Sequence, residues 1–338
     1  MRIGLDVMGG DHAPKAILEG ALAVADRLDD SDTLVLVGDE TIIRAAVDSW
    51  DGPRHRIDIV ATTEVIGMDE SPVEAVRTKL DSSIVRLSQM AGRKADEPLD
   101  AIISAGNTGA KVTGAQMYMR RLPNVARPGI AVTIPTFSGP IVVVDVGANI
   151  EPKPHHLAQY GVMGETYARL ILGLENPRVG LMNVGGEEQK GTHQLKEARD
   201  RLRATPDLNF IGYVEGRGVF DGDADVVITD GVVGNVMLKL AEGLSSGIFR
   251  AIATEVQQTD PELAVRFAPI VKSIYKRHDY HEYGGAPLLG VNGCCLICHG
   301  SSEARTIVNA VLRAKQYVQS GMNAAMVDRL AMMEPETA

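Results

Sequence analysis

Five loops of small and polar residues, each following a run of aliphatic residues, carry most of the groups in this chain that can do chemistry. They lie at 101–110, 141–149, 179–191, 226–235 and 294–302. In a parallel sheet such loops leave the same edge of successive strands, so their backbone N–H groups and polar side chains can converge on one ligand. The pattern predicts an enzyme whose site is built from strand-end loops.

The first and fifth of these loops have the composition of anion-binding turns. Residues 104–109 (SAGNTG) follow a strand and open a helix, where N–H groups, hydroxyls and the helix dipole favour a phosphate-sized anion. His299 and Ser301 stand at a second helix start. An ordinary strand-to-helix turn with an Asn or Thr cap explains the first motif equally well, but two such turns at one sheet edge favour a ligand.

The three middle loops add charged and amide side chains. Lys190 can bring positive charge to an anion, and Asn235, with Lys239 one helical turn later, can hold a carbonyl or phosphate oxygen. Asp145 and Asn149 flank a glycine in the second loop. Taken singly, each of these residues is more often a solvated loop residue or a helix cap.

Several common catalytic signatures are missing. No G-x-G-x-x-G follows the first strand, and residues 109–112 (GAKV) lack the spacing and the hydroxyl of a P-loop. The zinc-peptidase pattern H-E-x-x-H does not occur either. These observations argue against common nicotinamide, ATP and zinc-peptidase chemistry and leave an anion site without a nucleotide.

A cysteine cluster in the fifth loop invites a cofactor interpretation. Cys295, Cys298 and His299 match the haem c attachment pattern, and the two cysteines also resemble a redox or zinc half-site. Haem attachment accompanies export, zinc needs further ligands, and an apolar strand is a place where cysteine acts as a small hydrophobe. We interpret all three cysteines, Cys294 included, as structural.

Composition sets the class of protein. The chain has 338 residues, of which 45% are hydrophobic and only 4% aromatic, which suits an aliphatic core around a buried parallel sheet. The formal net charge of −10 argues against nucleic-acid binding and requires a local basic patch for any acidic partner. The first residues lack a secretion signal, and no uninterrupted apolar segment is long enough to span a bilayer, so we expect a cytoplasmic protein.

Strands alternate with helices along the chain. Before the five loops, further strands are expected at 2–7, 33–37 and 56–61, and a capping box at 71–74 (SPVE) predicts a helix start. Eight or more strands in this alternation predict an α/β fold, a three-layer αβα sandwich around a doubly wound, mostly parallel sheet.

One segment, 244–287, breaks the alternation with two helical stretches. Apolar residues recur at helical spacing from 263 to 274, which favours a protruding hairpin used for dimer packing, as a lid or on a membrane surface. We expect a single catalytic unit over 1–332 that includes this insertion, and a flexible tail at 333–338.

Seven motifs in order resemble the bacterial phosphate acyltransferase family, PlsX. They are 6–14 (DVMGGDHAP), 68–83 (MDESPVEAVRTKLDSS), 104–109, 145–149, 185–191, 234–239 and 290–302 (GVNGCCLICHGSS). One such motif is weak, but seven in sequence are highly specific; Thr78 stands where the family often has lysine. The resemblance implies transfer of a long acyl chain from acyl carrier protein to inorganic phosphate, giving acyl phosphate for phospholipid biosynthesis.

The resemblance has further implications. It implies a homodimer, a fold related to phosphotransacetylases and isocitrate dehydrogenases, and no metal or organic cofactor. It also implies loose attachment to the inner membrane surface, where a membrane glycerol-3-phosphate acyltransferase takes the product onward.

Phosphate is already an adequate nucleophile, so the protein has to hold it beside the thioester and stabilise the oxyanion. Lys190 is expected to offset charge, Asn235 to lie near the carbonyl, and His299 to bind phosphate or protonate the leaving thiolate. Asn107, Thr108 and Ser301 are assigned to phosphate. The whole expected substrate-binding set is Asp6, Gly10, Asp11, Ser104, Asn107, Thr108, Gly109, Asp145, Asn149, Lys239 and Ser301.

Acyl carrier protein is strongly acidic and needs a basic face. Residues 117–127 carry Arg120, Arg121 and Arg127 with no acid, which predicts the docking site, and Lys272, Lys276 and Arg277 form a second candidate. Solvated charge explains each of these residues singly. Three rival functions stay open: a phosphotransacetylase-type enzyme using acyl-CoA, a metal-dependent decarboxylating dehydrogenase, and a membrane-associated scaffold without activity.

Overall fold

A large sheet organises the chain. The computed structural model describes residues 1–277 and 283–333, which contain an eleven-stranded sheet of order β3-β2-β1-β4-β11-β10-β5-β6-β9-β7-β8. The strands are β1 (Arg2–Asp6), β2 (Thr33–Gly38), β3 (Ile57–Ala61), β4 (Ala101–Ser104), β5 (Gly129–Thr136), β6 (Gly139–Val144), β7 (Val179–Met182), β8 (Phe210–Val214), β9 (Val226–Ile228), β10 (Ala286–Leu289) and β11 (Cys294–Ile297). The three early strands are confirmed to within one residue at each end.

The sheet has two parallel halves that run in opposite directions. β3, β2, β1, β4 and β11 form one half, and β6, β9, β7 and β8 form the other. Between them β10 is antiparallel to both β11 and β5, and β5 is antiparallel to β6. The prediction that all five loops leave one sheet edge is therefore wrong, because three successive antiparallel pairings reverse the strand direction.

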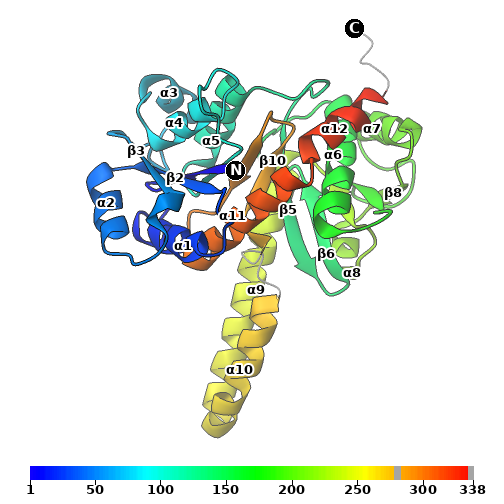
Figure 1. Cartoon of the computed structure of the whole chain (residues 1–338). Coiled ribbons are helices and arrows are strands. Elements are labelled where there is room, and N and C mark those ends of the chain that lie inside the picture. Colours follow the sequence, from blue (N-terminus) through cyan, green and yellow to red (C-terminus); the bar gives the residue numbers. More distant parts are fainter. Residues whose placement is uncertain (278–282, 334–338) are drawn as a thin grey trace.

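Helices cover both faces of the sheet, which gives the predicted three layers (Figure 1). Alternate residues of one strand enter separate cores: Leu34 and Leu36 of β2 enter the first, Val35 and Val37 the second. The first face carries α1 (Lys15–Ala25), α2 (Glu40–Asp48), α6 (Pro154–Leu172), α7 (His193–Ala204), α11 (Ala304–Gln319) and α12 (Met322–Ala331). The second carries α4 (Ser83–Met90), α5 (Thr108–Gly114), a π-helix (Ala115–Met119) and α8 (Gly216–Asp221), with α3 (Pro72–Thr78) packed on α5.

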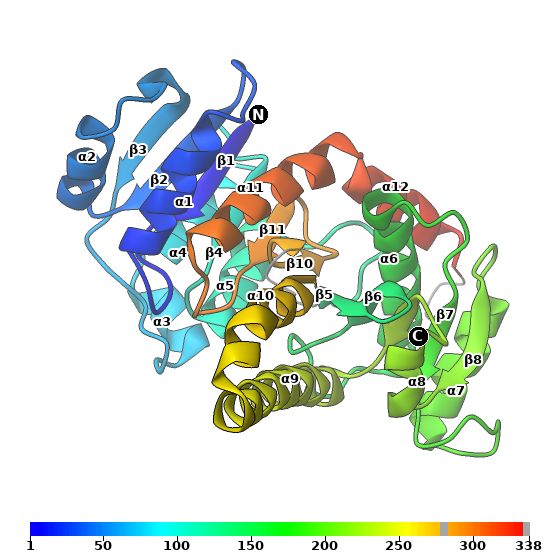
Figure 2. The ribbon, with the colours of Figure 1, turned by 90° about the horizontal axis from the view of Figure 1, so that it is seen from below.

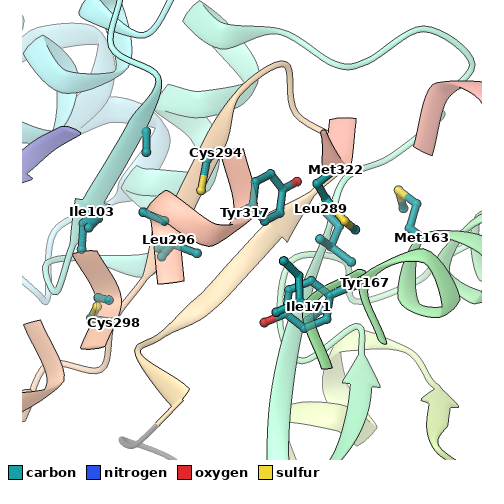
Figure 3. Packing of buried hydrophobic residues seen from close by; sticks show 14 of the residues in the cluster. Ile103, Met163, Tyr167, Ile171, Leu289, Cys294, Leu296, Cys298, Tyr317 and Met322 are labelled. Carbon is teal, nitrogen blue, oxygen red and sulfur yellow. The ribbon is translucent and has the colours of Figure 1, made fainter. Parts of the chain in front are cut away.

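The larger hydrophobic core crosses from one half of the sheet to the other. Figure 3 shows Cys294 and Leu296 of β11, Leu289 of β10, Tyr317 of α11 and Tyr167 of α6 in this cluster. Tyr167 is only 1% exposed and Tyr317 only 2%. Burying both faces of β10 and β11 in this way joins the halves through shared apolar packing. The unit boundaries at 1–332 stay a prediction, and residues 334–338 lie outside the described chain.

The predicted hairpin is formed by α9 (Gly231–Thr259) and α10 (Pro261–Arg277), which project together from the sheet (Figure 1). α9 begins well before the predicted boundary at 244, and β10 already starts at Ala286; residues 278–282 are outside the described chain. Seen from below, the hairpin lies between the half that carries α3 and α5 and the half that carries α8 (Figure 2).

The hairpin exposes an apolar stripe. Four residues of α9 spaced one turn apart are between 49% and 67% exposed: Val236, Leu240, Leu244 and Ile248. On α10, Leu263 and Ile270 are 45% and 52% exposed, whereas Phe267 and Val271 line a cavity of about 360 Å³ shared with α9. No helix within residues 1–277 and 283–333 is long and apolar enough to cross a membrane.

Candidate active site

A buried hydrogen-bond network ties the end of β1 to the end of β4. The Ser104 hydroxyl donates to Asp6 Oδ2 over 2.6 Å and accepts from the Gly106 N–H over 3.1 Å, while Asp6 Oδ1 accepts from the Met8 N–H over 3.1 Å. Burial raises the pKa of the Asp6 carboxyl, and bonds from Ser104 and Ser83 lower it in part. The network fixes the loops that follow both strands.

Asn107 anchors the neighbouring loop at 67–70 to the start of α5. Its side-chain oxygen accepts from the Ala110 N–H over 3.0 Å and so caps the helix. Its amide nitrogen donates to the carbonyl oxygens of Gly67, Met68 and Glu70 over 3.1, 3.2 and 3.2 Å. One end of the amide thus caps α5 and the other holds the 67–70 loop, and the next residue, Thr108, is exposed.

The start of α3 differs from the predicted capping box at 71–74. α3 begins at Pro72 as predicted, but the Ser71 side chain makes no capping hydrogen bond, so the capping box itself is wrong. The turn before the helix is held instead by Asn107 and by Glu70, whose Oε1 accepts from the Gly67 N–H and from Lys79 Nζ, each over 2.6 Å.

The loop after β11 packs against the loop after β1. The Asp11 N–H donates to the Gly300 carbonyl oxygen over 2.7 Å. Gly10 adopts a φ of +111°, and a Cβ at this position would lie 3.0 Å from the Ala105 Cβ and 3.1 Å from the Gly300 oxygen. Glycine is therefore needed where three loops meet. The exposed carboxylate of Asp11 lies against Gly300.

His299 and Ser301 form a local pair at this junction. The Ser301 N–H donates to His299 Nδ1 over 3.3 Å, and the Ser301 hydroxyl oxygen lies 2.8 Å from the same nitrogen. Because Nδ1 accepts the backbone N–H, the neutral ring carries its proton on Nε2. His299 is exposed, so this tautomer suits a donor to an anion or to a leaving thiolate.

The structure adds Lys111, which sequence reasoning missed. Lys111 is 3% exposed, and its Nζ donates to the carbonyl oxygens of Ser104 over 2.9 Å and Cys298 over 3.3 Å. Burial lowers the pKa of Lys111 to about 8, and the thiols of Cys298 and Cys295 and the Asp6 carboxylate raise it in part. A signal was present, because the lysine directly follows the 104–109 motif, but it was considered only as a P-loop lysine.

A second group of loops is organised by Asp145 at the end of β6. This carboxylate is fully buried and accepts from the N–H groups of Ile130, Gly147, Ala148 and Asn149 over 2.9, 3.2, 3.0 and 2.6 Å. Burial raises the pKa of Asp145, and these backbone bonds lower it in part. Asp145 therefore holds the backbone of the 145–149 loop in place through these hydrogen bonds.

The first turn of α9 packs on this loop. The Gly231 N–H donates to the Asn149 carbonyl oxygen over 2.8 Å, and Asn235 Nδ2 donates to the Val146 carbonyl oxygen over 3.2 Å. A Cβ on Gly234 would lie only 2.0 Å from the Asp145 carbonyl oxygen, so the close approach requires glycine. Asn235 is thereby fixed at the base of the hairpin.

The predicted site residues thus fall into two groups. Lys190 and Lys239 are both exposed, the first in the loop after β7 and the second one turn beyond Asn235. Asp145, Asn149 and Asn235 meet at the end of β6, and their part in binding substrate stays a prediction. The loops after β1, β4 and β11 bring together Asp6, Gly10, Asp11, Ser104, Asn107, Thr108, Gly109, His299 and Ser301, whose roles toward phosphate also stay predictions.

Two of the predicted docking arginines share a cavity. Arg120 and Arg121 line a hollow of about 490 Å³ together with Arg93, which sequence reasoning missed because it lies in a segment of mixed charge. Arg120 follows the π-helix with a left-handed φ of +69°. Arg127 is exposed beyond this loop.

The cysteines occupy the buried positions expected of them. Cys294 and Cys295 lie in β11 and Cys298 directly follows it, all at most 2% exposed, and burial raises the pKa of the Cys295 thiol to about 12. Over residues 1–277 and 283–333, no group of three or more His, Cys, Asp or Glu side chains is placed to hold a metal ion.

Solved structures share this fold. The chain aligns with the EutD phosphotransacetylase of Staphylococcus aureus at a TM-score of 0.59 and 17% identity, covering 95% of this chain and 94% of that one. A phosphotransacetylase of Streptococcus pyogenes aligns at a TM-score of 0.61, with the same identity and coverage. The predicted αβα fold of the phosphotransacetylase kind is confirmed.

Sequence comparisons identify the family. A family model described as "Fatty acid synthesis protein" matches residues 1–325. The phosphate acyltransferase of Heliobacterium modesticaldum is 45% identical over 335 residues, which is 98% of each chain, and that of Syntrophotalea carbinolica is 43% identical over 337 residues, 99% of this chain and 95% of that one. The chain belongs to the phosphate acyltransferase (PlsX) family, and it is an acyltransferase.

Proposed function

We propose that this protein transfers a long acyl chain from acyl carrier protein to inorganic phosphate and releases acyl phosphate for phospholipid biosynthesis. A phosphate oxygen attacks the thioester carbonyl carbon, the new C–O bond forms, and the C–S bond breaks. The His299 Nε2–H gives its proton to the departing thiolate, and the proton of the attacking hydrogen phosphate restores the ring. The balance is one hydrogen phosphate and one thioester to one acyl phosphate and one thiol.

The observation that supports this best is the junction of the loops after β1, β4 and β11. It is tied by the 2.7 Å bond from the Asp11 N–H to Gly300 and the 2.6 Å bond from Ser104 to Asp6. Phosphate attack needs donors that hold the anion in place before reaction, because positioning and electrostatic stabilisation are what the enzyme can add. Thr108 and His299 supply exposed donors on this fixed base.

We assign the second group of loops to the acyl thioester, because it packs on the start of α9, which lies between the two halves of the sheet (Figure 2). Asn235 sits at the base of the hairpin, held by its bond to Val146, and we assign it to the developing oxyanion of the carbonyl. We propose that Lys190 offsets the negative charge of phosphate. Lys190 is exposed on the long loop after β7 and can approach the phosphate from solvent. No metal or organic cofactor is needed for these steps.

An assay of donor choice tests the proposed function. Purified protein is given a long-chain acyl thioester of acyl carrier protein or of coenzyme A, each with and without phosphate. We expect phosphate-dependent loss of the carrier-protein thioester at a kcat/KM at least about tenfold above that for acyl-CoA. Preference for acyl-CoA would support the phosphotransacetylase-type rival, NAD(P)H formation the dehydrogenase, and absence of turnover the scaffold.

We propose that acyl carrier protein docks on the arginine cavity. Arg93, Arg120 and Arg121 concentrate positive charge on a protein whose net charge is −10, and an acidic partner needs such a patch; Arg127 extends it. Arg120→Glu with Arg121→Glu should raise KM for the carrier protein about tenfold and leave KM for phosphate unchanged. Arg44→Glu on α2 is the control, and an unchanged carrier-protein KM in the double variant rejects this face.

We propose that the hairpin serves a homodimer and a membrane surface. The exposed apolar stripe on α9 fits a second copy of this chain. The exposed apolar side chains of α10 fit the inner membrane surface. There this cytoplasmic enzyme would pass its poorly soluble product to a membrane glycerol-3-phosphate acyltransferase. Leu240→Gln with Leu244→Gln should halve the mass in sedimentation, and Leu263→Gln with Ile270→Gln should abolish liposome flotation. Ile42→Gln on α2 is the control, and wild-type mass or flotation rejects the respective role.

A further inference from the structure

We propose that Lys111 is a positioning residue for the phosphate site, holding the carbonyl ends of β4 and β11 at a fixed spacing. The inference rests on the proposed function, because it takes the junction of these loops as the place where phosphate binds. Lys111 Nζ donates to the carbonyl oxygens of Ser104 over 2.9 Å and of Cys298 over 3.3 Å, and Cys298 lies 187 residues beyond Lys111 in the sequence. One ammonium thereby joins the loop that carries Thr108 to the loop that carries His299.

The clamp lies where the strand pairing ends. β4 and β11 pair in register up to Ser104 and Ile297, and the Cys298 N–H donates to the Ser104 carbonyl oxygen over 2.9 Å. Beyond this point the chains separate into their loops. Lys111 contributes the last connection between them from α5, whose start is in turn capped by Asn107. Removing it frees the two loops relative to each other without breaking the sheet.

A buried ammonium at this place lowers the stability of the fold unless other interactions offset its burial. Transfer of a charge from water into an apolar interior is unfavourable, and the hydrogen bonds to two carbonyl oxygens offset only part of it. The titratable groups that face Lys111 are Asp6 on β1 and the thiols of Cys295 and Cys298 in and after β11. A phosphate dianion bound above the junction would favour the protonated form of Lys111, whose pKa burial lowers to about 8.

Lys315 provides a matched comparison for a purely structural clamp. Its Nζ donates to Asp29 Oδ2 and Asp32 Oδ2, each over 2.6 Å, and its side chain is 14% exposed. Asp32 directly precedes β2, so this clamp lies at the opposite end of the strands from the phosphate junction. The same substitution at the two lysines therefore separates loss of stability from loss of the site.

The experiment measures binding of inorganic phosphate by calorimetry, and KM and kcat for phosphate, on Lys111→Met, Lys111→Arg and Lys315→Met in the full chain. We expect at least a tenfold weaker phosphate Kd and higher phosphate KM for Lys111→Met, with the thioester KM within twofold of wild type. Lys111→Arg should restore most of the affinity. Lys315→Met should lower Tm but leave phosphate affinity within twofold.

The pH dependence of phosphate affinity adds a second test, because a lysine that only stabilises the fold would not change it. Phosphate affinity of the wild type should fall above pH 8, and the affinity of Lys111→Arg should stay level there, because guanidinium does not titrate in this range. Folded Lys111→Met that binds phosphate as tightly as wild type overturns the inference. If Lys111→Met does not fold, a Lys111→Arg profile that falls like wild type overturns it instead.

The role of Lys111 and the acyl transfer to phosphate can be tested separately. Wild-type protein that binds phosphate in a Lys111-dependent manner but shows no phosphate-dependent turnover contradicts the function and supports the clamp. Turnover with an unaltered phosphate KM in the Lys111 variants contradicts the clamp alone. Wild-type protein that neither binds nor turns over phosphate contradicts both.

Discussion

The Ser104 hydroxyl donates its hydrogen to the Asp6 carboxylate over 2.6 Å, and this bond lies directly beneath the loops that we assign to phosphate. Asp6 and Ser104 are 1% and 7% exposed and come from adjacent parallel strands, β1 and β4. The bond therefore holds the ends of β1 and β4 in a fixed position relative to each other. Because the loops assigned to phosphate follow these two strands, the same bond positions the loops.

Loss of this bond should destabilise the fold and weaken phosphate binding together. Ser104→Ala removes the 2.6 Å bond to the buried Asp6 carboxylate, which should lower the free energy of unfolding by about 1–3 kcal/mol and raise phosphate KM. Urea denaturation and steady-state kinetics measure the two effects. The control is Thr166→Val, which removes a buried hydroxyl that donates to the Val162 carbonyl oxygen in α6. Equal phosphate KM in Ser104→Ala and wild type would contradict the coupling.

Asn107 should matter more for activity than an ordinary helix cap does. Asn107→Ala removes the cap of α5 and the three bonds to the 67–70 loop, so we expect at least a tenfold loss in kcat/KM for phosphate. Asp39→Ala removes the cap of α2, where Asp39 accepts from the Ile42 N–H over 3.1 Å. Loss of either cap should lower the free energy of unfolding by about 1 kcal/mol. Asn107→Ala with wild-type kinetics would show that the 67–70 loop plays no part.

Two glycines of α9 should respond oppositely to alanine. Gly234→Ala places a Cβ 2.0 Å from the Asp145 carbonyl oxygen, so the base of the hairpin has to move and we expect a loss of more than about 2 kcal/mol. At Gly243 no described atom beyond the neighbouring residues and the nearby helix backbone lies within 4 Å of the corresponding position, and alanine there should stabilise the helix by about 0.5–1 kcal/mol. Thermal or urea unfolding of both variants checks this pair. Similar effects of the two changes would contradict the packing at Asp145.

Burial of Lys111 should appear in the pH dependence of stability. Its pKa is lowered from 10.5 to about 8 in the folded state, so between these pH values the unfolded chain binds a proton that the folded chain does not. Rising pH therefore favours the folded state in this window, and the penalty is fully present below pH 8. The unfolding free energy of wild type relative to Lys111→Met should rise by about 3 kcal/mol from pH 8 to 10.5. A difference that is flat across this window would contradict a charged, buried Lys111.

The layers of the fold were predictable from local sequence, whereas strand direction was not. Alternating residues such as Leu34 and Val35 enter opposite cores, so each strand must be covered on both faces by helices. The reversal between the two halves depends on β10, which follows the hairpin and inserts between β11 and β5. Nothing in the four residues Ala286–Leu289 specifies these distant partners, because register and direction are set by long-range packing.

The loops of the candidate site were predictable, but the functions of individual side chains within them were not. Asn107 was expected to contact phosphate, yet its hydrogen bonds hold the 67–70 loop, a segment distant in sequence. Lys111 was considered only as a P-loop lysine, and its burial was not expected, because a lysine on a helix is normally exposed. Its burial follows only from the meeting of α5 with the ends of β4 and β11. Spacing within a motif does not reveal such contacts.

The fate of labelled phosphate shows directly whether this protein transfers an acyl chain to phosphate. Purified protein is incubated with long-chain acyl-[acyl carrier protein] and ³²P-labelled inorganic phosphate, and both the acyl phosphate and the released carrier thiol are measured. We expect one labelled acyl phosphate for each thiol released, and neither product in His299→Ala at more than a few per cent of the wild-type rate. Thiol release without label in an acyl phosphate would show that the thioester is hydrolysed and that phosphate is not the acyl acceptor.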